Sequence, residues 1–156
     1  MPSTLTNPEN LTTDEFQSAM HDLVDRFEES IVGSGLPLAQ FPVVHRFTPG
    51  LYIREIFMPA GSVLTSKIHK TEHPFVISKG VVSVWTAEGG TVIMKAPHTG
   101  VTKPGTRRVL FVHEDTMWTT FHVGEEENVE EIEDRIIEPR VNSRLLAKTE
   151  ELQCLG

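Results

Sequence analysis

Cysteine is almost absent from the chain: Cys154 is the only one among 156 residues. A single cysteine cannot form an intramolecular disulfide and cannot build a metal site from thiolates. No apolar run approaches the roughly 20 residues that a membrane helix requires, and the first residues lack the charged-then-apolar pattern of a signal peptide. These absences predict a soluble protein in a reducing cytoplasm.

Positive charge is also scarce, because 14 lysines and arginines face 22 acidic residues and the net charge is −8. Proteins that hold extended nucleic acid gain most of their affinity by neutralising phosphates with lysine and arginine. The composition therefore argues against an extended nucleic-acid partner, although it leaves room for a local basic pocket. A length of 156 residues with 38% hydrophobic residues fits one structural domain with a single core.

Residues 1–40 read as an N-terminal arm followed by a helix. The first ten residues hold two prolines and small polar residues, which predicts a flexible arm. From Thr12 to about Ile31 apolar residues recur every three or four positions, and Thr12 with Glu15 forms a candidate capping box. We expect an amphipathic helix that covers a barrel or forms a subunit contact.

Residues 41–124 consist of short β-like runs separated by glycine and proline, a layout typical of a small barrel or sandwich. The predicted strands are Leu51–Met58, Gly61–Ile68, Phe75–Ser78, Val81–Thr86, Thr91–Lys95, Val109–His113 and Thr116–Val123, with a turn at 97–100. Residues 125–156 begin with an acidic segment whose apolar stripe predicts a solvated helix stopped by Pro139. A short docking helix or a disordered end follows.

Lys67, His69 and His73 form the most informative cluster. Lys67 and His69 are two residues apart, so on one strand they project to the same face. A turn at 70–72 would bring His73 back beside His69. Two facing imidazoles suit a metal ion or a proton-transfer pair.

The segment from Gly61 to Gly80 resembles the first cupin motif, in which a glycine, a His-x-His pair, an acidic ligand and a closing glycine follow one another. In this resemblance Gly80 is the closing glycine, His69 the second histidine, His73 stands at the acidic position and Lys67 at the first histidine. The second motif, Pro-x-Gly-x-x-His, is similar to residues 103–108, with Arg108 in place of histidine. The resemblance covers residues 45–123.

The resemblance implies a mainly β fold: a cupin double-stranded β-helix, or jelly-roll barrel, with an N-terminal amphipathic helix and a C-terminal acidic helix added. The order of residues 68–73, 104–108 and 114–122 before the acidic helix is also similar to small cupin-like proteins encoded by tailed phages. That likeness implies a phage protein expressed in the bacterial cytoplasm and no established activity.

One interpretation of the site is a metal centre. Lys67 and Arg108 replace two of the four usual cupin ligands, which argues against the ordinary site of three histidines and a glutamate. His122 could complete a set with His69 and His73, because Thr116, Trp118, Thr120 and His122 share one strand face. This set predicts one divalent ion, Zn, Fe, Mn or Ni.

The other interpretation uses the cations. Lys67, Arg108 and Arg54 cannot be buried together without an anion, because an unpaired buried charge is very costly. Glu55 or Glu72 could supply a carboxylate internally, and a carboxylate, phosphate or nucleotide ligand could do so from outside. Aromatic walls for such a ligand are available; they are Tyr52 and Trp118.

Two functions remain open from the sequence. In the first, the barrel binds or acts on a small anionic molecule, a nucleotide-derived one in one variant, with His69 and His73 as metal ligands or as catalytic acid and base. In the second, the barrel is a non-catalytic scaffold, such as a phage virion or assembly component, and the N-terminal helix makes the contacts. We expect a homodimer, because the edge strands of a small barrel are commonly covered by a second subunit.

Overall fold

The computed structural model describes residues 12–35 and 41–139, beginning with helix α1 (Thr13–Gly33). The predicted capping box is present. Thr12 Oγ1 accepts from the Glu15 amide at 3.3 Å, and the Glu15 carboxylate accepts from the Thr12 amide at 2.8 Å. These bonds satisfy two backbone donors that the first helical turn leaves open. The predicted N-terminal arm and C-terminal tail lie outside the described residues.

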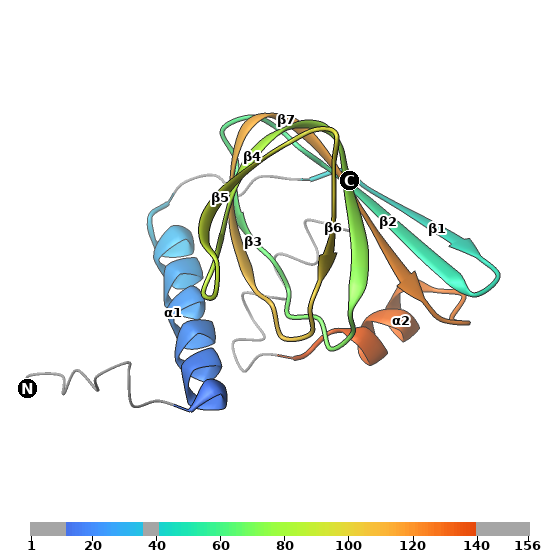
Figure 1. Cartoon of the computed structure of the whole chain (residues 1–156), viewed down its shortest axis with the longest axis horizontal. Coiled ribbons are helices and arrows are strands. Elements are labelled where there is room, and N and C mark those ends of the chain that lie inside the picture. The colour runs from blue at the N-terminus through green and yellow to red at the C-terminus, as the bar shows by residue number, and fades with distance from the viewer. Residues whose placement is uncertain (1–11, 36–40, 140–156) are drawn as a thin grey trace, which may run out of the picture.

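Seven antiparallel strands follow α1: β1 (Val43–Thr48), β2 (Leu51–Met58), β3 (Val63–Thr65), β4 (His73–Thr86), β5 (Gly90–Lys95), β6 (His98–Thr102) and β7 (Arg108–Val123). The main path of the sheet is β1-β2-β7-β4-β5, while β3 pairs with β7 and β6 pairs with β4. The two long strands β4 and β7 bend and so belong to both halves of the sheet. As Figure 1 shows, the sheet thereby wraps into a jelly-roll barrel.

The predicted strands are largely confirmed, with differences where the chain bends. Strand β2 has the predicted bounds, and the runs Phe75–Ser78 and Val81–Thr86 belong to the single strand β4. Strand β1 was not predicted from the sequence, and β6 occupies a segment interpreted as a turn. Strand β3 is only three residues long, shorter than the predicted Gly61–Ile68.

The hydrophobic core lies between the two halves of the bent sheet. It is formed by Phe41, Ile56, Met58, Phe75, Ile77, Val82, Val84, Leu110, Val112 and Trp118. Successive side chains of a strand point to opposite faces, so every second residue of β2 and β7 reaches this interior. The same alternation, continued toward one end of the barrel, supplies the polar residues described below.

Buried ion pairs, together with part of its apolar stripe, hold helix α1 against the barrel. Arg107, 5% exposed, lies 2.7 Å from Asp25 and 2.8 Å from Glu28, and it donates to the His21 carbonyl at 3.0 Å. Val24 is buried beside them, whereas other stripe residues such as Phe27 stay partly exposed. The amphipathic helix is confirmed, but part of its apolar surface stays exposed.

Helix α2 (Val129–Ile136) begins after Asn128, whose side chain accepts from the Glu131 amide at 2.9 Å. Its residues Ile132 and Ile136 are buried and pack against Tyr52 of β2. The end of α2 joins the segment that leads out of β3, because the Lys70 amide donates to the Ile136 carbonyl at 2.7 Å and the Glu138 amide donates to the Ile68 carbonyl at 2.8 Å. The acidic helix is thus present, packed at one end of the barrel (Figure 1).

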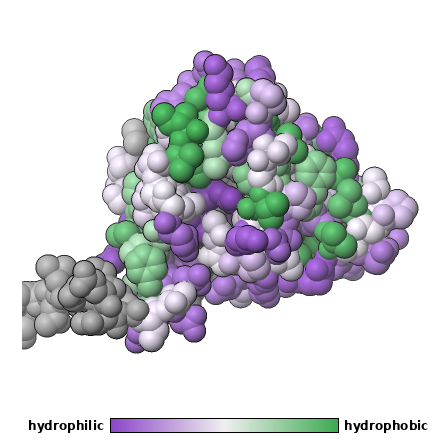
Figure 2. All heavy atoms as spheres, viewed as in Figure 1, coloured by the Kyte–Doolittle hydropathy of each residue, from purple (hydrophilic) through white to green (hydrophobic). Residues whose placement is uncertain are grey.

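The outer surface mixes polar and apolar residues. In the face shown in Figure 2, apolar residues form separate spots among hydrophilic ones. The most exposed large apolar side chains of the strands are Val123 at 77%, Ile93 at 68% and Val101 at 54%. Within the described residues, neither helix is long and apolar enough to cross a membrane.

Candidate metal and small-molecule site

A cavity of about 110 Å³ opens at the end of the barrel next to α2. All the site residues predicted from the sequence line it: Tyr52, Arg54, Lys67, His69, His73, Arg108, Trp118 and His122. Aliphatic side chains of the core complete the wall, among them Ile56, Met58 and Leu110. The convergence of imidazoles and cations in a common cavity is therefore present.

Strand register explains how residues distant in sequence meet there. Tyr52 of β2 pairs with His122 of β7, and His73 of β4 pairs with Thr102 of β6. Because directly opposite residues project to the same side of a sheet, each pair delivers two side chains to the cavity. His69 comes from the segment after β3, which is held against the residue following α2 through a bridge between His69 and Ile137.

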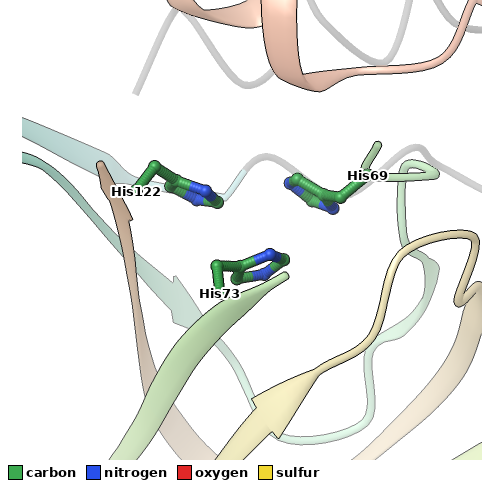
Figure 3. A group of neighbouring side chains, drawn as sticks. All are labelled: His69, His73 and His122. Atoms are coloured by element: carbon green, nitrogen blue, oxygen red, sulfur yellow. The ribbon is translucent and has the colours of Figure 1, made fainter. Parts of the chain in front are cut away.

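His69, His73 and His122 form a compact triad (Figure 3). The ring centroids of His69 and His73 are 4.4 Å apart, those of His73 and His122 are 4.4 Å apart, and those of His69 and His122 are 5.3 Å apart. One nitrogen from each ring lies within 4.8 Å of the others, a grouping that could hold a metal ion. His73 and His122 are only 3% and 2% exposed.

The hydrogen bonds around the triad leave nitrogen lone pairs directed inward. His73 Nδ1 lies 3.1 Å from the Thr71 carbonyl, which can only accept, so Nδ1 carries the proton and Nε2 keeps a lone pair. His122 Nε2 lies 3.0 Å from Thr120 Oγ1. His122 Nδ1 is buried and has no hydrogen-bond partner within the described residues. An orphaned ring nitrogen inside a histidine cluster is the observation expected of a metal ligand.

All three histidines are neutral at pH 7. Burial, followed by the nearby His73 and His122, lowers the pKa of His69 to about 2. Burial and the neighbouring His73 lower the pKa of His122 to about 3, and burial also lowers the pKa of His73. Neutral imidazole is the form that binds metal ions, so the site needs no proton release before an ion enters.

Arg108 forms a second feature of the same cavity. Its guanidinium carbon lies 5.2 Å from the centre of the Phe75 ring and 5.8 Å from that of Trp118. Its Nε is buried without a hydrogen-bond partner among the described residues, and burial lowers the pKa of the guanidinium. Aromatic faces attract a cation but do not satisfy its N–H donors. Arg108 therefore keeps donors free for a ligand.

Lys67 has a different partner from those considered from the sequence. Its ammonium lies 3.3 Å from Glu133 of α2. Glu72 instead pairs with Lys103 at 2.7 Å, and Glu55 lies 3.9 Å from Arg46 on the outside of the sheet. Neither Glu55 nor Glu72, the two carboxylates considered from the sequence, lines the cavity.

Glu133 and Thr102 line the cavity, but neither was singled out from the sequence. Glu133 belongs to the acidic segment, whose carboxylates looked alike in the sequence. Thr102 lies on the unpredicted strand β6, is 2% exposed, and its buried Oγ1 has no hydrogen-bond partner within the described part of the chain. His45 of β1 is half-buried, and its Nδ1 lies 2.6 Å from the Tyr52 hydroxyl.

No protein-family model matches the chain, and no curated protein matches it. Solved structures with a similar backbone include an RmlC-like cupin family protein from Methanocaldococcus jannaschii, with 11% identity, TM-score 0.45, and coverage of 58% of this chain and 94% of that one. Another is a cupin-2 domain containing protein from Shewanella frigidimarina, with 8% identity, TM-score 0.43, and coverage of 62% and 91%. A salicylate 1,2-dioxygenase from Pseudaminobacter salicylatoxidans has 14% identity and TM-score 0.48, with coverage of 64% and 32%.

The bent strands β4 and β7 and the histidine-lined barrel mouth agree with the resemblance noted in the sequence. The fold is that of a cupin. In this cupin barrel Lys67, at the position of the first motif histidine, is engaged by Glu133, and His122 of β7 joins His69 and His73. Arg108, at the position of the second-motif histidine, faces the same cavity as a free donor group rather than as a ligand.

Proposed function

We propose that this cupin holds one divalent metal ion at His69, His73 and His122 and that it binds or converts a small anionic molecule beside it. The observation that carries the proposal is the buried triad itself, with three neutral rings and an unpartnered His122 Nδ1. Three protein ligands leave coordination positions open, as in catalytic metal sites. Imidazole suits Zn, Fe and Ni ions in particular.

The charges of the cavity support an anionic ligand. Among the described residues that line it, Lys67 is paired with Glu133, whereas the buried Nε of Arg108 has no hydrogen-bond partner. Neutral histidines add no negative charge, so a divalent ion would increase the positive excess further. Because buried charge is stable only when it is compensated, an anion completes this site better than a neutral molecule does.

The residues around the cavity would orient the imidazoles and the anion and exclude water. The Thr71 carbonyl and Thr120 hydroxyl orient two of the imidazoles, and Arg108 orients the anion. The rings of Tyr52 and Trp118 shield the site from water, since both are buried. A bound divalent ion would act as a Lewis acid on an oxygen of the ligand.

Metal analysis of the purified protein tests the proposal. We expect about one equivalent of a divalent ion per chain in the wild type, and loss of that ion in His69→Ala and His122→Ala. His113→Ala is the matched control, because His113 is exposed and bonds Ser83 outside the cavity. Retention of the ion by both triad variants, or the failure of Zn, Fe, Mn and Ni salts to bind at all, would contradict the proposal.

A second candidate function is the scaffold role, as a phage virion or assembly component or as a homodimer built through α1. It is favoured by the exposed apolar side chains Leu23, Phe27 and Val32, which are 45%, 39% and 38% exposed. Light scattering of the wild type and of Phe27→Glu distinguishes the possibilities. A dimer that the substitution converts to a monomer supports contact through α1, and a wild-type monomer argues against the homodimer.

A further inference from the structure

Building on the proposed function, we infer that the anionic group of the ligand is a carboxylate, held by Arg108 and Thr102, and that it belongs to a small molecule with an apolar body. The inference rests on two buried donors that share the cavity and lack partners within the described residues, Arg108 Nε and Thr102 Oγ1.

Arg108 supplies the charge and the geometry. Its guanidinium is placed against Phe75 and Trp118, at 5.2 and 5.8 Å from their ring centres. The rings restrict the plane of the guanidinium without using its N–H donors. A planar fork of donors matches the two oxygens of a carboxylate, and a fork held in place loses less entropy on binding.

Thr102 supplies a hydroxyl where the fold does not need one. It is 2% exposed and pairs across the sheet with His73, so it lies beside the triad. Valine has the same shape and favours strands, yet this position carries a buried hydroxyl without a hydrogen-bond partner in the described chain. A ligand oxygen next to Arg108 would satisfy that hydroxyl.

The remaining walls define the body of the ligand. Ile56, Met58, Leu110 and Trp118 line the cavity and belong to the hydrophobic core. The volume of about 110 Å³ is somewhat smaller than an engineered cavity of about 150 Å³ that holds benzene. A carboxylic acid of up to about four carbons, which has no more heavy atoms than benzene, fits this space by the same comparison.

The same walls disfavour the phosphate and nucleotide alternatives. A phosphate group carries a charge of about −1.5 to −2 at pH 7 and offers three acceptor oxygens. The subsite itself offers one guanidinium and one hydroxyl, and these donors match the two oxygens and single charge of a carboxylate better than the oxygens and higher charge of a phosphate. A nucleotide is also several times larger than the enclosed volume.

Butanoate is the probe for the first experiment, titrated by NMR into Zn²⁺-loaded and into EDTA-treated protein. We expect butanoate to bind at least tenfold more tightly than butanamide, which has the same shape without the charge. From acetate to butanoate, affinity should rise about fourfold for each added methylene group. Adenosine monophosphate should bind more weakly than butanoate, and the reverse order would overturn the inference.

Two variants then locate the subsite. Arg108→Gln should lower butanoate affinity at least tenfold, because a charge-assisted pair is lost. Thr102→Val should lower it severalfold without lowering the melting temperature, because the variant removes a hydroxyl that the fold leaves unpaired. Lys103→Gln is the control, since Lys103 is an exposed cation paired with Glu72, and it should bind butanoate as the wild type does.

The outcomes separate this inference from the proposed function. Metal content is measured independently in every sample, so a protein that binds metal but not butanoate refutes the subsite alone. A protein that binds butanoate through Arg108 but holds no metal refutes the metal centre alone. If EDTA treatment abolishes butanoate binding while Arg108→Gln and Thr102→Val do not change it, then the ion holds the carboxylate and the inference is wrong.

Discussion

Replacing Arg107 should destabilise the protein more than replacing any surface arginine. The side chain of Arg107 is 3% exposed, and those of its partners Asp25 and Glu28 are 12% and 15% exposed. In Arg107→Met two neighbouring carboxylates would remain largely buried without their cation. Removing one member of a buried ion pair costs about 3–5 kcal/mol. Since whole domains are stable by only about 5–15 kcal/mol, this loss is a large share of the total.

Urea unfolding followed by circular dichroism measures the loss in free energy of unfolding, and thermal unfolding measures the change in Tm. For a domain of this size each kcal/mol changes Tm by about 2–4 °C, so Arg107→Met should melt about 6–20 °C lower than the wild type. The control is Lys103→Gln, whose pair with Glu72 has side chains 74% and 51% exposed. Such exposed pairs contribute at most about 1 kcal/mol.

A second variant tests the reasoning itself. Replacing Arg107, Asp25 and Glu28 together by Met, Leu and Leu removes the buried charges as a group, and buried ion clusters replaced in this way are often neutral or stabilising. The triple variant should therefore recover most of the stability lost in Arg107→Met. A cost below about 1 kcal/mol for Arg107→Met would show that water screens the cluster, and the argument from burial would fail.

Three further predictions concern the site and its frame. Because folding lowers the pKa of His69 to about 2 and of His122 to about 3 from 6.5, the unfolded chain binds more protons below pH 6.5. The free energy of unfolding of metal-free protein should then fall as pH drops below 6.5, by up to about 1.4 kcal/mol per pH unit for each histidine, and urea curves equal at pH 7.5 and 5 would contradict this. Zn²⁺ at a hundred times its Kd should raise stability by about 2.7 kcal/mol in thermal-shift assays, and His69→Ala should remove the effect; an unchanged shift in that variant would place the ion elsewhere. Gly80→Ala should lower the free energy of unfolding by at least about 2 kcal/mol in urea, because Gly80 has φ +102° and a Cβ there would meet Thr116 Oγ1 and the Asp115 carbonyl. Wild-type stability of this variant would show that the backbone around residue 80 can relax.

The triad could be predicted from the sequence because strands have a fixed side-chain period. The two-residue alternation along β7 placed His122 on the inner face, and the turn before β4 brought His73 beside His69. The resemblance to cupin motifs supplied the barrel that joins these segments. Local pattern and fold type together were sufficient for these residues.

Strand β6 and Thr102 could not be predicted by the same means. Pro97 and Gly100 were interpreted as a turn, yet Gly100 lies within β6. Glycine is needed there because the Phe75 ring occupies the space of a side chain, 2.6 Å from where a Cβ would be. Glycine in a strand often marks such a close approach. The strand partner of Gly100 is Phe75 of β4, 25 residues away, and a local sequence pattern cannot predict this pairing.

Long-range ion pairs could not be predicted from the sequence for a similar reason. Glu133 is one of several carboxylates in the acidic segment, and only its contact with Lys67, 66 residues earlier, distinguishes it. Arg107 and Arg108 are adjacent and identical in type, yet one binds α1 and the other lines the cavity. Which arginine points which way depends on the register of β7 with its neighbours, and that register is a property of the folded sheet.

The opposite orientations of these two arginines constrain how the loop before β7 can evolve. Deleting one residue between Lys103 and Thr106 would require the chain either to stretch or to slip by one position against β3 and β4. A slip by one residue exchanges the two faces of a strand, so the helix anchor would turn inward and the ligand-facing guanidinium would turn toward Asp25. Length changes in this loop should therefore be selected against even though its residues Lys103 and Pro104 are exposed to solvent.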